Sequence, residues 1–440
     1  MDLNEAVIAG DAATVRSLLE DGADPNALGP DGLPLLCAAV AGFDYGTAEA
    51  LVEAGADADR ELPDGTTPLL RAVDLGSPAL VGALLGSDSG AGLPETSRRR
   101  LLDSARHWWE VGEEEELRRR TGASGPAVRR WVEDEYTDVE EVSLGDLTVR
   151  AGHSGVLTAL EQAFGIAAPV AELVARAVPY PEACHANWSA ACFALGGRST
   201  PQDWSELVAL RHHPDPVHRR LLADVLGCRH FFAGHRARPD TDRDVEFLAD
   251  WVLDEPDGRV LAVVLEVYTD WGHAGQEAVG LRYADHADPR VRSEVPHCLS
   301  RDGIAPSEAA TAALLALSYD PDPAVRAVIA QVPGYPGEFT PNFRAALLRL
   351  IQDPDPGVRA RSAETLSASP DRTPEVTEAL AALLDEEDQL MRLEGACALA
   401  RRDDPRTEEA YERVGPLGPG FGIDHRVNAL WHYRSRNRLS

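Results

Sequence analysis

Apolar residues recur at helical spacing along most of the chain, in short segments separated by Gly, Pro and Asp. From about residue 170 to the end they predict pairs of helices, and one phrase opens the second helix of several pairs. It reads Asp-Pro-x-Val-Arg or a close variant, and Asp322, Asp355 and Asp388 are spaced 33 residues apart. Asp caps a helix and Pro suits its first turn, so each phrase predicts a helix start. Other copies begin at Asp215, Asp257 and Asp288.

The first 90 residues repeat with the same period but different phrases. Gly22-Ala-Asp24 returns as Gly55-Ala-Asp57, and the Asp-Gly pair at Asp31 returns at Asp64, followed by Thr-Pro-Leu. Short amphipathic segments at 14–20, 47–53 and 79–85 lie between these turns. A fixed period with helices in each unit predicts a solenoid.

The stretch between the two arrays breaks both patterns. Residues 87–94 are rich in Gly and Ser and predict a junction, and a long charged helix is expected from about 96 to 120. Its acidic and basic runs, 113–116 and 118–120, are interpreted as a solvated face with i,i+4 ion pairs. Apolar and polar residues alternate over 139–150 around Gly145-Asp146, which predicts a β-hairpin.

The turn and helix phrases of the first array resemble the ankyrin repeat, and the Asp-Pro-x-Val-Arg phrase resembles the short HEAT repeats of bacterial HEAT-like proteins. We therefore expect an all-α repeat solenoid. An ankyrin stack is predicted in 1–92, a helical connector with a β-hairpin in 93–169, and a HEAT-like superhelix in 170–440. Leu36 and Leu70 stand where the ankyrin family carries His, so the resemblance implies that the inter-repeat hydrogen bond of that His is missing.

The Asp and Arg of the HEAT-like phrase are expected to pair from repeat to repeat as a structural ladder. The predicted ladder residues are Asp288, Arg292, Asp322, Arg326, Asp355, Arg359 and Arg392.

Charge narrows the choice of partner. The net charge is −31, and a field of that sign repels nucleic acid. Residues 1–90 hold 16 Asp or Glu and three Arg, a net charge of −13, so a basic protein or peptide is the partner that suits the ankyrin surface. All 42 basic residues are Arg, which excludes lysine Schiff-base chemistry, P-loop phosphate binding and kinase-type ATP binding.

The compartment follows from what the chain lacks. Six scattered cysteines without a C-x-x-C pair favour a reducing environment. No signal-peptide pattern and no apolar run of bilayer length is present, so we expect a cytoplasmic protein that does not bind membranes.

The function that the sequence favours is a non-enzymatic scaffold or adaptor that binds protein or peptide partners on the concave faces of its repeats, without cofactor or metal. Oligomeric state stays open. The candidate contact residues are aromatic or imidazole side chains: Trp108, Trp109, Trp188, His212, His213 and His218.

Two other functions remain open at this point. One is an enzyme that modifies a peptide or small molecule in a pocket near 185–235, where His, Cys and Trp gather. A deep pocket there would favour it. The other is a nucleic-acid enzyme, which would need a continuous stripe of exposed Arg.

Overall fold

The computed structural model describes residues 1–86, 92–235, 241–300, 304–331, 340–421 and 424–437. The chain divides into two compact units, Met1–Asp240 and Thr241–Ser440. Over these described ranges, every helix is too short or too polar to cross a bilayer.

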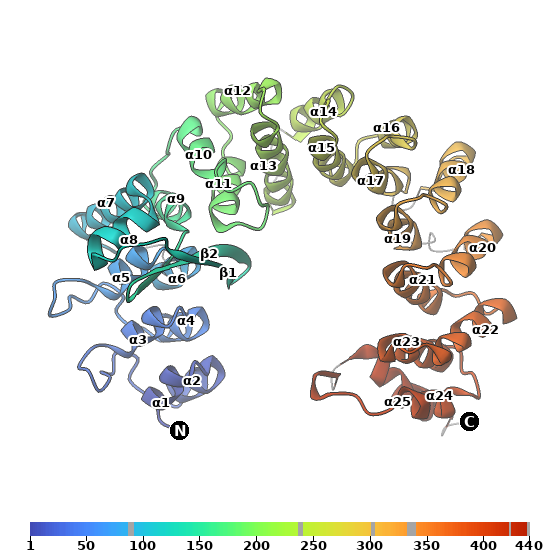
Figure 1. The fold of residues 1–440 in the computed structure, drawn as a ribbon, viewed down its shortest axis with the longest axis horizontal. Helices are drawn as coiled ribbons and strands as arrows, with labels where there is room; N and C mark the ends of the chain where they lie inside the picture. The colour runs from blue at the N-terminus through green and yellow to red at the C-terminus, as the bar shows by residue number, and fades with distance from the viewer. Residues whose placement is uncertain (87–91, 236–240, 301–303, 332–339, 422–423, 438–440) are drawn as a thin grey trace. The chain divides into compact units, whose positions relative to one another are not determined.

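The first unit is a succession of short helices with a small sheet after the eighth (Figure 1). Its elements are α1 (Leu3–Ala9), α2 (Ala12–Glu20), α3 (Leu35–Ala41), α4 (Tyr45–Glu53), α5 (Pro68–Leu75), α6 (Pro78–Leu85), α7 (Glu95–Val111), α8 (Glu113–Thr121), β1 (Val128–Asp134), β2 (Thr137–Leu144), β3 (Leu147–Arg150), α9 (His153–Ala163), α10 (Val170–Ala177), α11 (Ala186–Gly196), α12 (Pro201–Ala209), η1 (Leu210–His212) and α13 (Pro216–His235).

The second unit is helical throughout the part of it that is described. Its elements are α14 (Thr241–Trp251), α15 (Gly258–Asp270), α16 (Gln276–Tyr283), α17 (Pro289–Leu299), α18 (Glu308–Leu317), α19 (Pro323–Gln331), α20 (Pro341–Leu350), α21 (Pro356–Ala368), α22 (Pro374–Ala382), η2 (Leu383–Asp385), α23 (Gln389–Arg401), α24 (Thr407–Val414), η3 (Pro419–Phe421) and α25 (His425–Asn437).

Helices begin where the sequence signals predict. Asp288 and Asp355 are N-caps whose carboxylates accept backbone N–H groups of the first turn, and proline follows each of them. The Thr-Pro-Leu phrase acts in the same way, since the Thr67 hydroxyl accepts from the N–H of Leu70. The predicted all-α repeat fold is confirmed.

The ankyrin part packs around one apolar core. That core contains the paired helices α1 to α6, and the two positions where the family carries His are filled by the buried Leu36 and Leu70. Leu101 and Ala105 of α7 and Leu157 of α9 belong to the same core. The hydrophobic core therefore continues beyond the end of the ankyrin repeats.

The sheet is antiparallel, in the order β1-β2-β3. The predicted hairpin is confirmed: β2 and β3 pair in register from Glu141 with Arg150 to Leu144 with Leu147, around Gly145-Asp146. β1 was not predicted. Its residues are mostly exposed, so it lacks the alternation that marks a half-buried strand.

In the second unit the helices lie in two rows, visible in Figure 1. α15, α17, α19, α21 and α23 contact one another in sequence and form one row, while α16, α18, α20 and α22 form the other. We call the first the Asp-Arg row, because four of its helices, α17, α19, α21 and α23, begin with the repeated phrase that ends in Arg.

Candidate interaction surfaces

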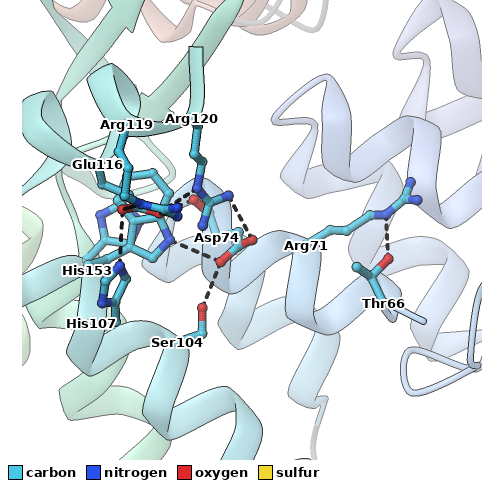
Figure 2. A network of polar contacts seen from close by, with 10 residues as sticks. Thr66, Arg71, Asp74, Ser104, His107, Glu116, Arg119, Arg120 and His153 are labelled. Atoms are coloured by element: carbon cyan, nitrogen blue, oxygen red, sulfur yellow. Dashed lines mark hydrogen bonds and ion pairs between the residues drawn. The ribbon is translucent and has the colours of Figure 1, made fainter. Parts of the chain in front are cut away.

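Trp108 lies inside the first unit, at the junction between the third ankyrin repeat and the connector. It is 1% exposed, its ring stacks on His153 with centroids 4.5 Å apart, and the Arg120 guanidinium lies 4.5 Å from its centroid. Its Nε1 donates to the Asp74 carboxylate at 3.0 Å. The same carboxylate accepts from the Ser104 hydroxyl at 2.7 Å and from Arg120 at 3.1 Å (Figure 2). Trp108 is therefore a core residue and cannot contact a partner in this fold.

Glu116 anchors the same junction (Figure 2). It is fully buried and accepts hydrogen bonds from Arg119, Arg120 and His107. These bonds, that from Arg119 first, hold the pKa of the Glu116 carboxyl well below its ordinary value. The predicted i,i+4 pair of Glu116 with Arg120 is present. The prediction that this charge run forms a solvated face is wrong for Glu113 and Glu116, because both are buried.

The sheet is fixed to the third ankyrin repeat by Asp134. This buried carboxylate accepts from the Ser77 hydroxyl at 2.5 Å and from the Ala79 N–H at 3.1 Å, so it helps to cap α6, and Arg150 pairs with it. Arg150 also lies over the Phe43 ring, 4.4 Å from its centroid. The connector thus binds the loops that join the two helices of successive ankyrin repeats.

The backbones of the two parts meet at Gly76 and Gly152. The Gly152 N–H donates to the Gly76 carbonyl at 3.1 Å. A Cβ on Gly76 would lie 2.1 Å from the Arg150 carbonyl oxygen, and one on Gly152 would lie 2.4 Å from the Gly76 carbonyl oxygen. Only glycine allows this approach.

Trp109 is partly buried beside a second ionic cluster. Arg176, 1% exposed, lies over its ring at 5.1 Å and donates to Glu161 and Glu172, and Arg106 pairs with the same two carboxylates. This cluster was not predicted, because its members are up to 70 residues apart and follow no repeat.

Trp188 is also interior. It is 1% exposed, and its Nε1 donates to Asp224 at 2.8 Å. The neighbouring His185 is buried against Tyr180, with ring centroids 4.4 Å apart, and burial lowers the pKa of His185 to about 4. Both side chains therefore stabilise the stack between α10 and α13.

Two of the three cysteines of the central region have pKa values raised by burial. Burial raises the pKa of Cys192 well above its ordinary value and that of Cys228 to about 11, so neither thiol is a thiolate near neutral pH. Cys184 is exposed. Throughout the described part of the chain, no three His, Cys, Asp or Glu side chains are grouped as a metal ion would require.

The three candidate histidines lie where α13 begins and differ in exposure: His212 ends η1, His213 follows it, and His218 is in the first turn of α13. His213 stacks on His218 with centroids 3.7 Å apart, and its Nδ1 accepts from the Asp215 N–H at 3.1 Å. His218 is partly buried, and burial together with His213 lowers its pKa. His212 is exposed. Only His212 is well placed for a partner.

The Arg residues of the repeated phrase do pair with the next repeat, but with a carboxylate other than the predicted one. Nε and Nη2 of Arg292 donate to Asp320 at 2.7 and 2.8 Å, and those of Arg326 donate to Asp353 at 2.8 Å. Arg359 lies 3.8 Å from Glu386. Each acceptor lies two residues before the next capping Asp.

The predicted Asp residues cap their own helices instead. Asp288, Asp322 and Asp355 accept from N–H groups two or three residues further on. Arg392 donates to the carbonyls of Glu386 and Glu387. The signal for the true acceptors was present, since Asp320 and Asp353 are 33 residues apart within two Asp-Pro-Asp phrases. These Arg side chains are partly buried and paired, so they do not form a continuous stripe of exposed Arg.

Substitution of a ladder Arg tests its contribution. Arg326→Met should lower the free energy of unfolding by about 2–3 kcal/mol, because it leaves the nearly buried Asp353 without its ion pair. Urea denaturation measures the loss. Arg290→Met is the control, because the exposed Arg290 pairs with a half-buried Asp288 that keeps its backbone N–H donor at the start of α17, and it should cost less than about 0.5 kcal/mol. Equal losses would mean that the ladder does not stabilise the stack.

Comparisons with known proteins agree with the repeat phrases. A family model for ankyrin repeats in three copies matches residues 3–94, and a model for HEAT repeats matches residues 311–400. The predicted resemblance is therefore confirmed in those segments: the chain contains ankyrin repeats followed by HEAT repeats. Repeats of both kinds are generally protein-interaction scaffolds.

Similarity to whole proteins is low. A search of curated proteins gives no match. The X-ray structure of Escherichia coli YibA is 15% identical, covers 62% of this chain and 93% of its own, and has a TM-score of 0.47. The crystal structure of an engineered protein is 17% identical over 100% of both chains, with a TM-score of 0.37.

Proposed function

We propose that this protein is a non-enzymatic interaction scaffold whose ankyrin turns bind a basic protein or peptide segment. The observation that carries this proposal is the set of exposed carboxylates at equivalent turns of successive repeats. Asp24 and Asp57 are exposed at one turn position, and Asp31 and Asp64 at another. With a net charge of −13 in the first 90 residues, these turns attract cations.

The turns that carry the carboxylates are tied to one another. Asn26 donates through Nδ2 to the Gly55 carbonyl at 3.1 Å, and its Oδ1 accepts from the Asp57 N–H at 2.9 Å. Asp31 and Asp64 each accept from the N–H two residues on, which holds their own turns. A partner would therefore meet a row of charges whose spacing is already set, which lowers the entropy cost of binding.

The second unit also carries a group of carboxylates, on the Asp-Arg row. Glu266 and Asp270 are exposed on α15, and Glu294 is partly buried on α17. Burial and the two neighbouring carboxylates raise the pKa of Glu294 to about 7, from an ordinary value of 4.5. A cationic side chain bound here would relieve that repulsion.

The raised pKa makes stability depend on pH. The folded chain holds the proton of the Glu294 carboxyl more tightly than the unfolded chain does. The stability that the protonated Glu294 contributes is therefore present below pH 4.5 and is lost as pH rises through 7. Glu294→Gln should therefore raise the free energy of unfolding by about 1–2 kcal/mol at pH 8, allowing for partial exposure, and change it little at pH 4.5. Urea denaturation at both pH values checks this. Glu364→Gln, exposed on α21, is the control and should show no such difference.

Binding of an acetylated octalysine peptide, measured by calorimetry, tests the proposal. Asp31→Asn with Asp57→Asn removes two charges yet keeps the side-chain acceptors of the turns. Because an exposed ion pair contributes about 0.5 kcal/mol, the double variant should bind about fivefold more weakly. The matched control, Glu364→Gln with Glu375→Gln, removes two exposed charges of the second unit.

Two results would contradict the proposal. If both double variants lose the same affinity, the peptide responds to the net charge of the chain and not to the ankyrin turns. If octalysine does not bind at low salt, the turns do not form a basic-partner surface.

A further inference from the structure

The small sheet has an open edge along β1. β1 is the first strand in the order β1-β2-β3, and in the described part of the chain its strand neighbour is β2 alone. The helices that pack closely on the sheet contact the other two strands: α8 touches β2 and β3, α11 touches β2, and α5 touches β3. The side of β1 that faces away from β2 is therefore free to pair with another strand.

The backbone groups that point to the open edge belong to alternate residues of β1. β2 turns the backbone of Glu140 away from β1, since the Glu140 carbonyl accepts from the Ala151 N–H at 2.7 Å. Glu140 lies opposite Trp131, so these two residues form a pair without mutual hydrogen bonds. Because the two kinds of pair alternate along an antiparallel ladder, the N–H and C=O groups of Arg129, Trp131 and Glu133 point outward.

The side chains along this edge are exposed, and several of them are apolar. Trp131 is 54% exposed and touches His185 edge-on. Val128, at the start of the strand, is 69% exposed, and Tyr136, in the turn that follows it, is 91% exposed. Apolar side chains gathered beside an unpaired strand are typical of an interaction surface.

The sequence of β1 is complementary to itself. In an antiparallel pair centred on Trp131, that residue lies opposite its own copy, and Arg129 lies opposite Glu133 of the second copy. Each of these pairs exchanges two backbone hydrogen bonds, whereas a slide of two residues leaves Arg129 or Glu133 without a backbone partner. Arg129 already donates to Glu140 at 3.0 Å, so Glu133 of the second copy would join an existing ion pair.

We propose that two copies of this chain form a dimer in which β1 pairs with β1 in antiparallel orientation, so that their sheets join into one. Backbone hydrogen bonds supply most of the affinity, and the two Trp131 rings face each other across the two-fold axis. A strand of another protein would meet the same backbone without the match of Arg129 to Glu133, so a second copy is the occupant that fits this edge. The acidic ankyrin turns take no part, so this proposal and the proposed function can fail independently.

Sedimentation velocity of the full chain over a range of concentrations tests the dimer. We expect the wild-type chain to show a monomer–dimer equilibrium. Glu133→Arg sets an arginine against Arg129 at both ends of the interface, so its dimer should be about tenfold weaker. Asp146→Arg is the matched control, because it reverses the same charge at an exposed position in the turn between β2 and β3, away from the open edge. Its dimer should weaken less than about twofold.

Disulfide cross-linking tests the register. In a Cys184→Ser background, which removes the exposed native thiol, Trp131→Cys should give a covalent dimer on mild oxidation. The opposed Cα atoms would lie about 5.5 Å apart, a separation that a disulfide spans. Glu133→Cys should not cross-link, because its two copies would be more than about 10 Å apart. Three results would overturn the proposal: a wild-type chain that stays monomeric, equal losses in Glu133→Arg and Asp146→Arg, or equal cross-linking of Trp131→Cys and Glu133→Cys.

Discussion

Gly76→Ala is expected to lower the free energy of unfolding of the first unit by about 2–5 kcal/mol. The residue has φ of 70°, a left-handed conformation that costs an alanine about 1–2 kcal/mol. Its Cβ would also lie 2.1 Å from the Arg150 carbonyl oxygen, so the backbone of the connector must move, and overpacking of this kind costs a further 1–3 kcal/mol or so. Urea denaturation followed by circular dichroism measures the change.

Gly82→Ala is the matched control. Gly82 lies within α6, six residues further on, and an added Cβ there would meet nothing within 4 Å. Alanine is a better helix former, so this variant should be more stable by about 0.5–1 kcal/mol. Similar behaviour of the two variants would mean that the connector does not press on the third ankyrin repeat as described.

Trp108→Ala should be about as damaging, with a loss of about 3–5 kcal/mol. The substitution removes a fully buried ring that contacts both His153 and Arg120. It also removes the indole N–H that donates a hydrogen bond to Asp74. The same denaturation experiment applies, with Trp131→Ala as the control. Trp131 is 54% exposed and touches His185 edge-on, so its loss should cost less than about 1 kcal/mol.

Comparison of these two variants also distinguishes a structural role of Trp108 from a role in partner binding. If Trp108→Ala unfolded no more easily than Trp131→Ala, the interior position of Trp108 would be contradicted and the contact role predicted from the sequence would return. If the losses differ as expected, binding studies should leave Trp108 unchanged and begin with exposed aromatic residues such as Trp131 and Tyr136, which is 91% exposed.

Periodicity revealed most of the architecture. Helix starts at Asp288, Asp322 and Asp355 were predictable, because a capping carboxylate followed by proline is a local signal that tertiary packing seldom overrides. The hairpin around Gly145 was predictable for a similar reason, since turn chemistry and alternation occur within a dozen residues.

The junction was not predictable, because nothing repeats there. Glu116 looked like part of a solvated charge run, yet its carboxylate is buried by contacts with residues up to nine positions away and by the packing of α8 on the sheet. Adjacent Trp108 and Trp109 gave no clue to which of them faced inward. Sequence spacing identifies what a helix can bury, whereas the neighbour that covers it comes from a different part of the chain.

The residue two positions before each capping Asp has a consequence for how the array could change length. At this position Asp320 accepts from Arg292 of the preceding repeat, and Asp353 accepts from Arg326. Before Asp288 the same position is His286, and there the preceding phrase ends in Leu261 instead of Arg. Insertion or loss of one 33-residue unit between Asp320 and Asp353 would therefore keep every Arg matched to a carboxylate. Duplication of the unit one repeat earlier, which runs from His286 past Arg292, would set an Arg against an imidazole, and loss of that unit would set Leu261 against Asp320. We therefore expect the HEAT array to gain or lose units more readily in its later repeats than in its earlier ones.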